Sequence, residues 1–137
     1  MPSTIVDSGP LIAFFDRDDR HHRDAVAWLE KARKPLVTNI AVVTEITYLL
    51  NFSVELQTGF LRWAAGNLQL DHDTGSDLPR IADLMAKYAD LPADFADASL
   101  IALAERLKLS RIATTDRDFT IYRTLGRKPL RNVFFME

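Results

Sequence analysis

The stretch that decides the fold is Ser3-Thr4-Ile5-Val6-Asp7-Ser8-Gly9-Pro10. Its β-branched centre predicts a short buried strand, and the Ser-Gly-Pro after it predicts that the strand closes at Asp7. The apolar segment 11–15 that follows predicts a short helix. A carboxylate is therefore expected at the carboxyl end of a strand, just before a helix begins.

Strands and helices alternate along the rest of the chain. We expect further strands at 36–38, 68–70, 111–114 and, at the edge, 132–135. We expect longer helices from about residue 22 to Pro35 (with Asp19 as a candidate cap), at 39–50, at 54–65 with Gly66 at its end, at 78–88 and at 94–108. This alternation predicts an α/β fold with a mostly parallel sheet of four to five strands, covered on both faces. Because no repeat or linker interrupts the pattern, we expect a single domain over residues 1–137.

The composition is that of an ordinary globular protein, with 137 residues, 47% hydrophobic and 26% charged. No apolar run approaches the roughly 18 residues that a membrane span needs, so we expect no membrane association. The first residues lack a basic flank, and we expect no signal peptide. The absence of cysteine excludes disulfides and thiolate zinc sites, and it is compatible with the cytoplasmic location that we expect.

The net charge of −2 does not by itself indicate a nucleic-acid partner, but the charge is unevenly distributed. From Glu105 onward the basic residues are Arg106, Lys108, Arg111, Arg117, Arg123, Arg127, Lys128 and Arg131. Only four acids accompany them, namely Glu105, Asp116, Asp118 and Glu137. This basic quarter can contact phosphates, but on charge alone a solvated surface is the favoured explanation.

Asp7 and Asp116 each follow an expected strand of the sheet. The carboxyl ends of parallel strands lie at one edge, where α/β proteins build their sites, so these two carboxylates can meet despite their separation in sequence. Each also has a purely structural explanation. Asp7 can cap the helix after it, and Asp116 can form an Asx turn.

Glu45 lies in the segment 40–50, which is apolar around most of a helical circumference. We therefore expect a buried helix, in which an ionised carboxylate costs several kcal/mol unless it is compensated. No Lys or Arg stands three or four residues away. A divalent cation is the strongest candidate partner, and a distant buried arginine is the alternative.

Asp97 opens another largely apolar helix, and Asp94 precedes it by three residues, so that both can share one helical face. A carboxylate in a first helical turn is favoured by the helix dipole, which explains one of the two. It does not explain why two acids precede so apolar a segment.

Carboxylates gathered in this way suit hard cations such as Mg²⁺ and Mn²⁺, which prefer oxygen ligands. Such ions activate water and neutralise charge on a phosphodiester under attack. Other sites are poorly supported, because the chain has only five glycines and no glycine-rich phosphate loop. A phosphatase with Asp7 as nucleophile would usually carry a second aspartate at position 9, which is glycine.

Four blocks of sequence resemble the PIN domain family, and in particular VapC-type toxins of bacterial toxin–antitoxin pairs. These blocks are Ile5–Ile12, Thr44–Ile46, Leu91–Leu100 and Ala113–Phe119. The resemblance covers essentially the whole chain, in order, spacing and total length. It implies a three-layer α/β/α sandwich that is usually dimeric.

The resemblance also implies a function. It assigns Asp7, Glu45, Asp97 and Asp116 as an acidic quartet that binds Mg²⁺ or Mn²⁺ and hydrolyses RNA. It makes Thr114 an orienting residue and leaves Asp94 and Asp118 as accessory candidates. A cognate antitoxin is expected to wrap the toxin, in a groove that helices carrying Phe14, Phe15 and Trp28 would line. A catalytically silent PIN-like binding module and a PIN nuclease of RNA processing remain alternatives.

Overall fold

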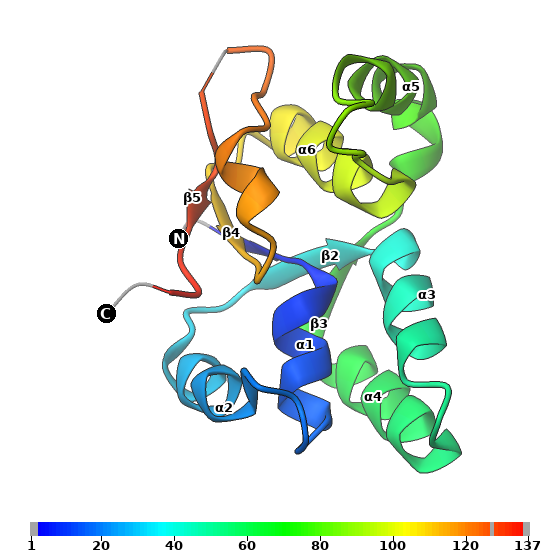
Figure 1. Cartoon of the computed structure of the whole chain (residues 1–137), viewed down its shortest axis with the longest axis vertical. Helices are drawn as coiled ribbons and strands as arrows, with labels where there is room; N and C mark the ends of the chain where they lie inside the picture. The colour runs from blue at the N-terminus through cyan, green and yellow to red at the C-terminus, as the bar shows by residue number, and fades with distance from the viewer. Residues whose placement is uncertain (1–2, 127, 136–137) are drawn as a thin grey trace.

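Residues 3–126 and 128–135 are described by the computed structural model, in which a sheet lies between two layers of helices (Figure 1). The strands are β1 (Thr4–Val6), β2 (Leu36–Asn39), β3 (Leu68–Asp71), β4 (Arg111–Ala113) and β5 (Arg131–Asn132). They pair in the order β3-β2-β1-β4-β5, and every pair is parallel. The predicted α/β/α sandwich with a parallel sheet is confirmed.

The helices are α1 (Ser8–Phe15), α2 (His22–Lys31), α3 (Ile40–Leu49), α4 (Val54–Asn67), α5 (Leu78–Lys87) and α6 (Phe95–Leu107). Two short 3₁₀ helices, η1 (Thr74–Asp77) and η2 (Arg117–Thr120), complete the elements. In Figure 1, α1, α2 and α4 lie below the sheet and α5 and α6 above it, with α3 beside the end of β2. Within the described ranges, no helix combines the length and apolar character needed to cross a membrane.

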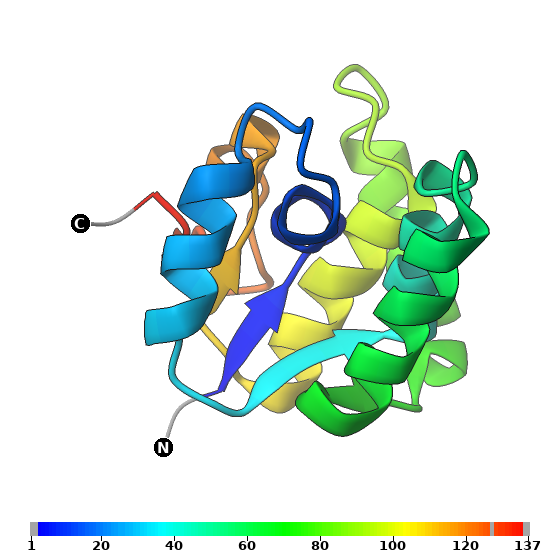
Figure 2. The ribbon, with the colours of Figure 1, turned by 90° about the horizontal axis from the view of Figure 1, so that it is seen from below.

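The central position of β1 places the candidate site. Ile5 and Val6 are fully buried between β2 and β4, so that the chain leaves the sheet at Asp7 from its middle. Figure 2 shows α1 nearly end-on where β1 ends. Because all five strands run the same way, their carboxyl ends share one edge, and the loops after β1, β2 and β4 open there.

Several boundaries differ from the sequence prediction. The edge strand β5 is shorter than expected, and Phe134 beyond it packs against the Trp28 ring with centroids 5.9 Å apart. Gly66 lies inside the last turn of α4, which continues to Asn67, and so it does not end that helix. Asp19 accepts from the amide of His21 in the preceding turn and provides no side-chain cap for α2.

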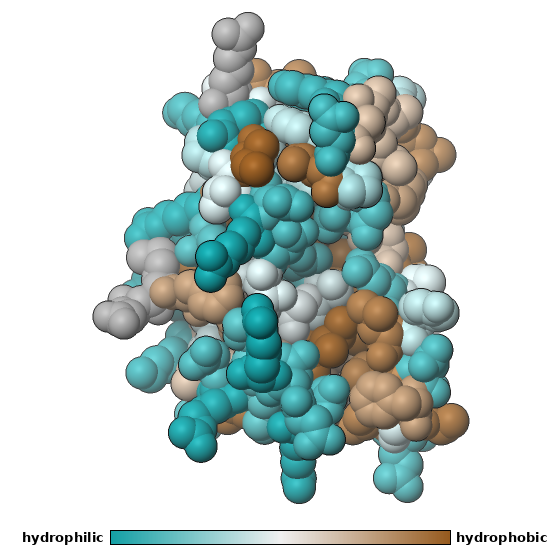
Figure 3. Space-filling view, in the orientation of Figure 1, coloured by the Kyte–Doolittle hydropathy of each residue, from teal (hydrophilic) through white to brown (hydrophobic). Residues whose placement is uncertain are grey.

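The expectation that α3 is buried on all sides was wrong. One flank of the helix is exposed, with Ile40 at 60%, Tyr48 at 69% and Leu49 at 46% of full exposure. On the face drawn in Figure 3, apolar surface lies mainly on the right, where α3, α4 and α5 are found. Helix α3 is apolar all round because one side packs against the core and the other side forms an exposed apolar surface.

Candidate active site

Asp7 joins the carboxyl ends of the two central strands. It is only 4% exposed, and as N-cap of α1 its Oδ1 accepts from the amide of Ser8 at 2.8 Å. Its Oδ2 accepts from the hydroxyl of Thr114, directly after β4, at 2.7 Å. Burial raises the pKa of Asp7 to about 6, against these two hydrogen bonds, and the charges of Asp116 and Asp94 add to the increase.

The Thr114 hydroxyl also forms a hydrogen bond to the backbone of Asp116 and so connects Asp7 to Asp116. The amide of Asp116 donates to the Thr114 hydroxyl oxygen at 2.9 Å, while that hydroxyl donates to Asp7. Asp116 Oδ1 accepts from the amide of Asp118 at 2.9 Å, which is the Asx-type turn considered from the sequence. The capping and turn roles of Asp7 and Asp116 are therefore real, and they fix the positions of both carboxylates.

Gly9 allows the loop after β4 to come so close. A Cβ at this position would lie 2.0 Å from Thr115 Oγ1 and 3.0 Å from Thr115 Cβ. Any side chain at position 9 would therefore displace the segment that carries Asp116. The same crowding leaves no room for the second aspartate of a phosphatase motif.

Glu45 reaches the cluster from α3. This helix begins at β2 with Asn39 as its N-cap, which accepts from the amide of Val42 at 3.1 Å. Glu45 Oε1 accepts from the hydroxyl of Ser8 at 3.3 Å, whereas Oε2 is buried without a hydrogen-bond partner. Burial, followed by repulsion from Asp7 and Asp94, raises the Glu45 pKa to about 7.

Asp97 reaches the cluster from the first turn of α6. It forms a capping box with Asp94, in which the Asp97 amide donates to Asp94 Oδ1 at 2.8 Å and Asp97 Oδ2 accepts from the Asp94 amide at 3.4 Å. Burial, together with the charges of Asp7 and Asp94, raises the Asp97 pKa to about 8. The capping box explains why two acids precede this helix, and it leaves Asp97 half-buried among like charges.

The structure thus places the four predicted acids near one another at one edge of the sheet, where the charge of Asp7 acts on Glu45 and Asp97 and that of Asp116 acts on Asp7 and Glu45. Asp7 is the common member, because its charge acts on both Glu45 and Asp97 and it feels that of Asp116. The accessory candidates divide. Thr114 and Asp94 belong to the cluster, whereas Asp118 binds Asp116 through its backbone and its charge acts on Tyr122.

Two residues near the cluster were not singled out from the sequence as parts of a site. Ser8 donates to Glu45, and its position directly after the strand-end Asp7 was the available signal. The buried hydroxyl of Tyr122 has no hydrogen-bond partner, and burial, with the charges of Asp97 and Asp116, raises its pKa. No local pattern distinguishes Tyr122 from an ordinary core tyrosine.

The donor chemistry of the cluster fits a hard cation. No group of three or more His, Cys, Asp or Glu side chains within residues 3–126 and 128–135 is arranged to hold an ion as it stands, since several carboxylates are turned toward amides. Glu45 nevertheless leaves one buried oxygen unpaired, and the described residues offer it no ion pair. Burial, and after it the charges of neighbouring acids, raises the pKa values of Asp7, Glu45 and Asp97, so these carboxylates are costly to ionise without a partner, and a divalent cation would supply one.

The fold and this cluster define a class of α/β protein whose acids gather where the parallel strands end. The chain belongs to the PIN domain family, whose profile matches residues 4–124. It is similar to Ribonuclease VapC26 of Mycobacterium tuberculosis, with 29% identity over 126 residues that cover 89% of this chain and 93% of that protein. The predicted family is confirmed.

The fold also matches a solved structure. The crystal structure of Mycobacterium tuberculosis VapC20, described as a Sarcin-Ricin loop cleaving toxin, superposes with a TM-score of 0.76. The match covers 86% of this chain and 93% of that one, at 18% identity. At this level of identity the likeness supports the sandwich fold alone.

Proposed function

We propose that this protein is a divalent-metal-dependent endoribonuclease, and that it is the toxin of a toxin–antitoxin pair acting in the cytoplasm. The observation that carries the proposal is the cluster of Asp7, Glu45, Asp97 and Asp116, with its unpaired buried Glu45 oxygen. Membership of the PIN domain family and the similarity to a VapC ribonuclease support it. One sheet that extends from Thr4 to Asn132 supports a single domain over residues 1–137.

The protein's own residues would hold the ion and fix the geometry. Mg²⁺ or Mn²⁺, bound by the four acids, would supply water activation and neutralise charge on the scissile phosphate. Thr114 holds Asp7 through its hydroxyl, and Ser8 orients Glu45 in the same way. These two hydroxyl groups hold the carboxylates of Asp7 and Glu45 in the cluster and oppose their turning outward to solvent.

The direct test is cleavage of a mixed RNA panel by the wild-type protein and by Asp97→Asn. We expect cleavage with Mg²⁺ or Mn²⁺, none with EDTA, and a loss of at least about 100-fold in the variant because one ligand and one charge are removed. Asp90→Asn, an exposed acid outside the cluster, is the matched control and should retain full activity. EDTA-resistant cleavage by Asp97→Asn would refute the mechanism. Metal binding by the wild-type protein without cleavage of any RNA in the panel would favour the silent binding module.

We further propose that the antitoxin binds a groove between the helices below the sheet. This groove of about 700 Å³ is lined by Phe14 and Phe15 of α1, Leu29 of α2 and Trp63 of α4. Trp28, which we had grouped with the two phenylalanines, lines a different cavity on the other side of α2. A reading frame for a small DNA-binding protein beside this gene would support the toxin assignment, and its absence would favour a nuclease of RNA processing.

The exposed flank of α3 supports the homodimer that the family suggests. Ile40, Tyr48 and Leu49 line an open apolar depression of about 890 Å³ together with Leu78 and Phe95. Monomeric proteins rarely expose so continuous an apolar surface, and a second copy would cover it. Light scattering of the wild-type protein should give twice the monomer mass, and Tyr48→Glu should give the monomer. A wild-type monomer at all concentrations would exclude this interface.

A further inference from the structure

A cavity at the amino end of the sheet, opposite the acid cluster, gathers four cations. We call it the basic pocket; it measures about 430 Å³, and its cations are Lys31, Arg33, Arg111 and Arg131. Thr4 and Trp28 contribute to its wall, and none of the described residues that line it is acidic. The pocket therefore offers positive charge beside an aromatic ring.

The sheet itself forces two of these charges together. Arg111 and Arg131 are partners in the register of β4 and β5, and both side chains line the pocket. Lys31 and Arg33, from the end of α2 and the segment after it, add to the same charge. Lys31, Arg33 and Arg131 are exposed and form no ion pair with any described residue.

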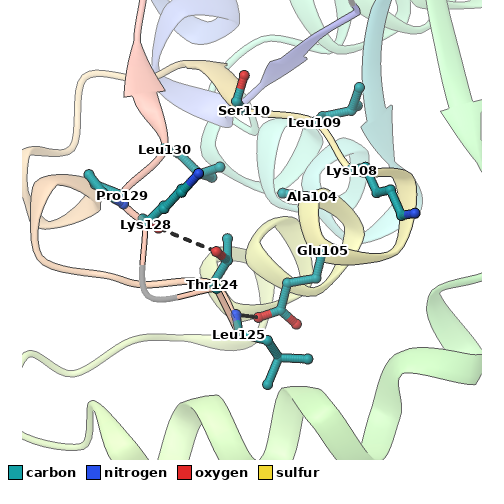
Figure 4. A pocket seen from close by; sticks show the side chains of 11 residues that line it. Ala104, Glu105, Lys108, Leu109, Ser110, Thr124, Leu125, Lys128, Pro129 and Leu130 are labelled. Atoms are coloured by element: carbon teal, nitrogen blue, oxygen red, sulfur yellow. Dashed lines mark hydrogen bonds between the residues drawn. The ribbon is translucent and has the colours of Figure 1, made fainter.

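Three other cations of the basic C-terminal quarter, Arg106, Lys108 and Lys128, are compensated or line another cavity. Arg106 is bound by Asp71 at 2.6 Å and by Asp77 at 3.0 Å. Lys108 and Lys128 line a separate cavity of about 250 Å³, which also contains the carboxylate of Glu105 (Figure 4). Of the four cavities described above and here, the basic pocket is the one whose described wall residues include several cations and no acid.

We propose that the basic pocket binds phosphate groups of the RNA substrate away from the point of cleavage; this proposal rests on the ribonuclease function proposed above. An arginine guanidinium group can donate two parallel hydrogen bonds to the oxygens of one phosphate, and an indole ring has a face on which a base can stack. The acid cluster repels RNA phosphates that do not touch the ion, so attraction must come from another surface. An acidic peptide would use the charges but would have no particular use for the exposed part of Trp28.

The basic pocket and the acid cluster lie at opposite ends of the short strand β1. Thr4 lines the basic pocket and Asp7 is central to the acid cluster, and they are separated by three residue steps of β1. At about 3.3 Å for each step, this corresponds to about 10 Å along the strand. Because β1 is the buried central strand, this separation runs through the interior, and an RNA has to extend by several nucleotides over the surface of the protein to reach the basic pocket.

The test compares two double variants with equal loss of charge. Arg33→Gln with Arg131→Gln removes two cations of the basic pocket, and Arg62→Gln with Lys87→Gln removes two exposed cations elsewhere. Binding of a single-stranded RNA of about 20 nucleotides is measured by fluorescence anisotropy in EDTA, over a range of salt concentrations. If two phosphate contacts are lost, the slope of log K against log salt should fall by about 1.4, with about ten-fold weaker binding near 0.15 M salt.

A second measurement separates this proposal from the proposed function. With Mn²⁺, the pocket variant should cleave a trinucleotide as fast as the wild type, while its KM for the long RNA rises and its kcat is unchanged. An unchanged salt slope and KM, with the wild type still cleaving RNA, would overturn the basic pocket alone. Weaker binding of polyglutamate without weaker binding of RNA would overturn it as well. A wild-type protein that neither binds nor cleaves RNA would remove both proposals.

Discussion

Asp7→Asn should stabilise the metal-free protein at neutral pH, although it removes a residue of the candidate site. Burial raises the pKa of Asp7 from 3.8 to about 6, so the folded state holds this carboxylate at a cost once it ionises. At 1.36 kcal/mol for each pKa unit, the cost is about 3 kcal/mol at pH 7. Asparagine has no charge, and its amide can still accept from Ser8 and donate to the hydroxyl oxygen of Thr114.

The gain is reduced by the hydrogen bond that the Thr114 hydroxyl then loses, which is worth about 1 kcal/mol. We therefore expect a net stabilisation of about 2 kcal/mol at pH 7.5 in EDTA. For an acid whose folded pKa is raised, the unfolded chain ionises first as pH rises, so the wild type loses stability between about pH 4 and pH 7. Below pH 4 both states are protonated, and the advantage of Asp7→Asn disappears.

The assay is urea unfolding followed by circular dichroism at pH 4 and pH 7.5 in EDTA. Asp90→Asn, at an exposed position, should change the free energy of unfolding by less than about 0.5 kcal/mol at either pH. Addition of Mn²⁺ at pH 7.5 should stabilise the wild type more than Asp7→Asn, because the variant lacks one carboxylate. A variant less stable than the wild type at pH 7.5, or a difference that does not depend on pH, would refute the reasoning.

Two further predictions concern packing and charge around the site. Gly9→Ala places a Cβ against Thr115 and should lower the free energy of unfolding by about 1–3 kcal/mol and reduce RNA cleavage. Gly59→Ala, with open space around the added Cβ, should leave the stability unchanged or raise it. Equal melting temperatures for the two variants would contradict this prediction. Arg106→Gln leaves the carboxylates of β3 and η1 without their cation and should cost about 2 kcal/mol in urea unfolding, well beyond Arg62→Gln. A cost for Arg106→Gln that persists at pH 3, where the carboxylates are protonated, would show that packing and not charge is responsible.

The local features of the candidate site could be predicted because short-range rules govern them. Asp7 had to follow a buried strand and precede a helix, and the structure shows it as the cap of α1. The helix expected at 39–50 begins there, with Asn39 as its N-cap. Asp94 and Asp97 were expected on one helical face at the start of a helix, and the structure shows them together in a capping box there. These outcomes depend on residues within about four positions of each other, a range that sequence patterns describe well.

The prediction for α3 failed for an instructive reason. A helix that is apolar all round is expected to be buried, but the same pattern arises when one side packs against the core and the other side is an exposed apolar surface. Sequence alone does not show whether another part of the chain covers the second side. Glu45 is accordingly half-buried. Its unpaired oxygen, and not deep burial, is the feature that identifies it as a candidate site residue.

By itself the sequence determined the order of strands and helices, and with it the edge of the sheet at which Asp7 and Asp116 emerge. Tertiary structure decided which distant charges lie next to one another. Arg106 pairs with Asp71, 35 residues away, whereas Arg111 and Arg131 are brought side by side by the pairing of β4 with β5. The physical reason is range: backbone propensity and capping act within a helical turn, but an ion pair depends on which distant segments the sheet brings together.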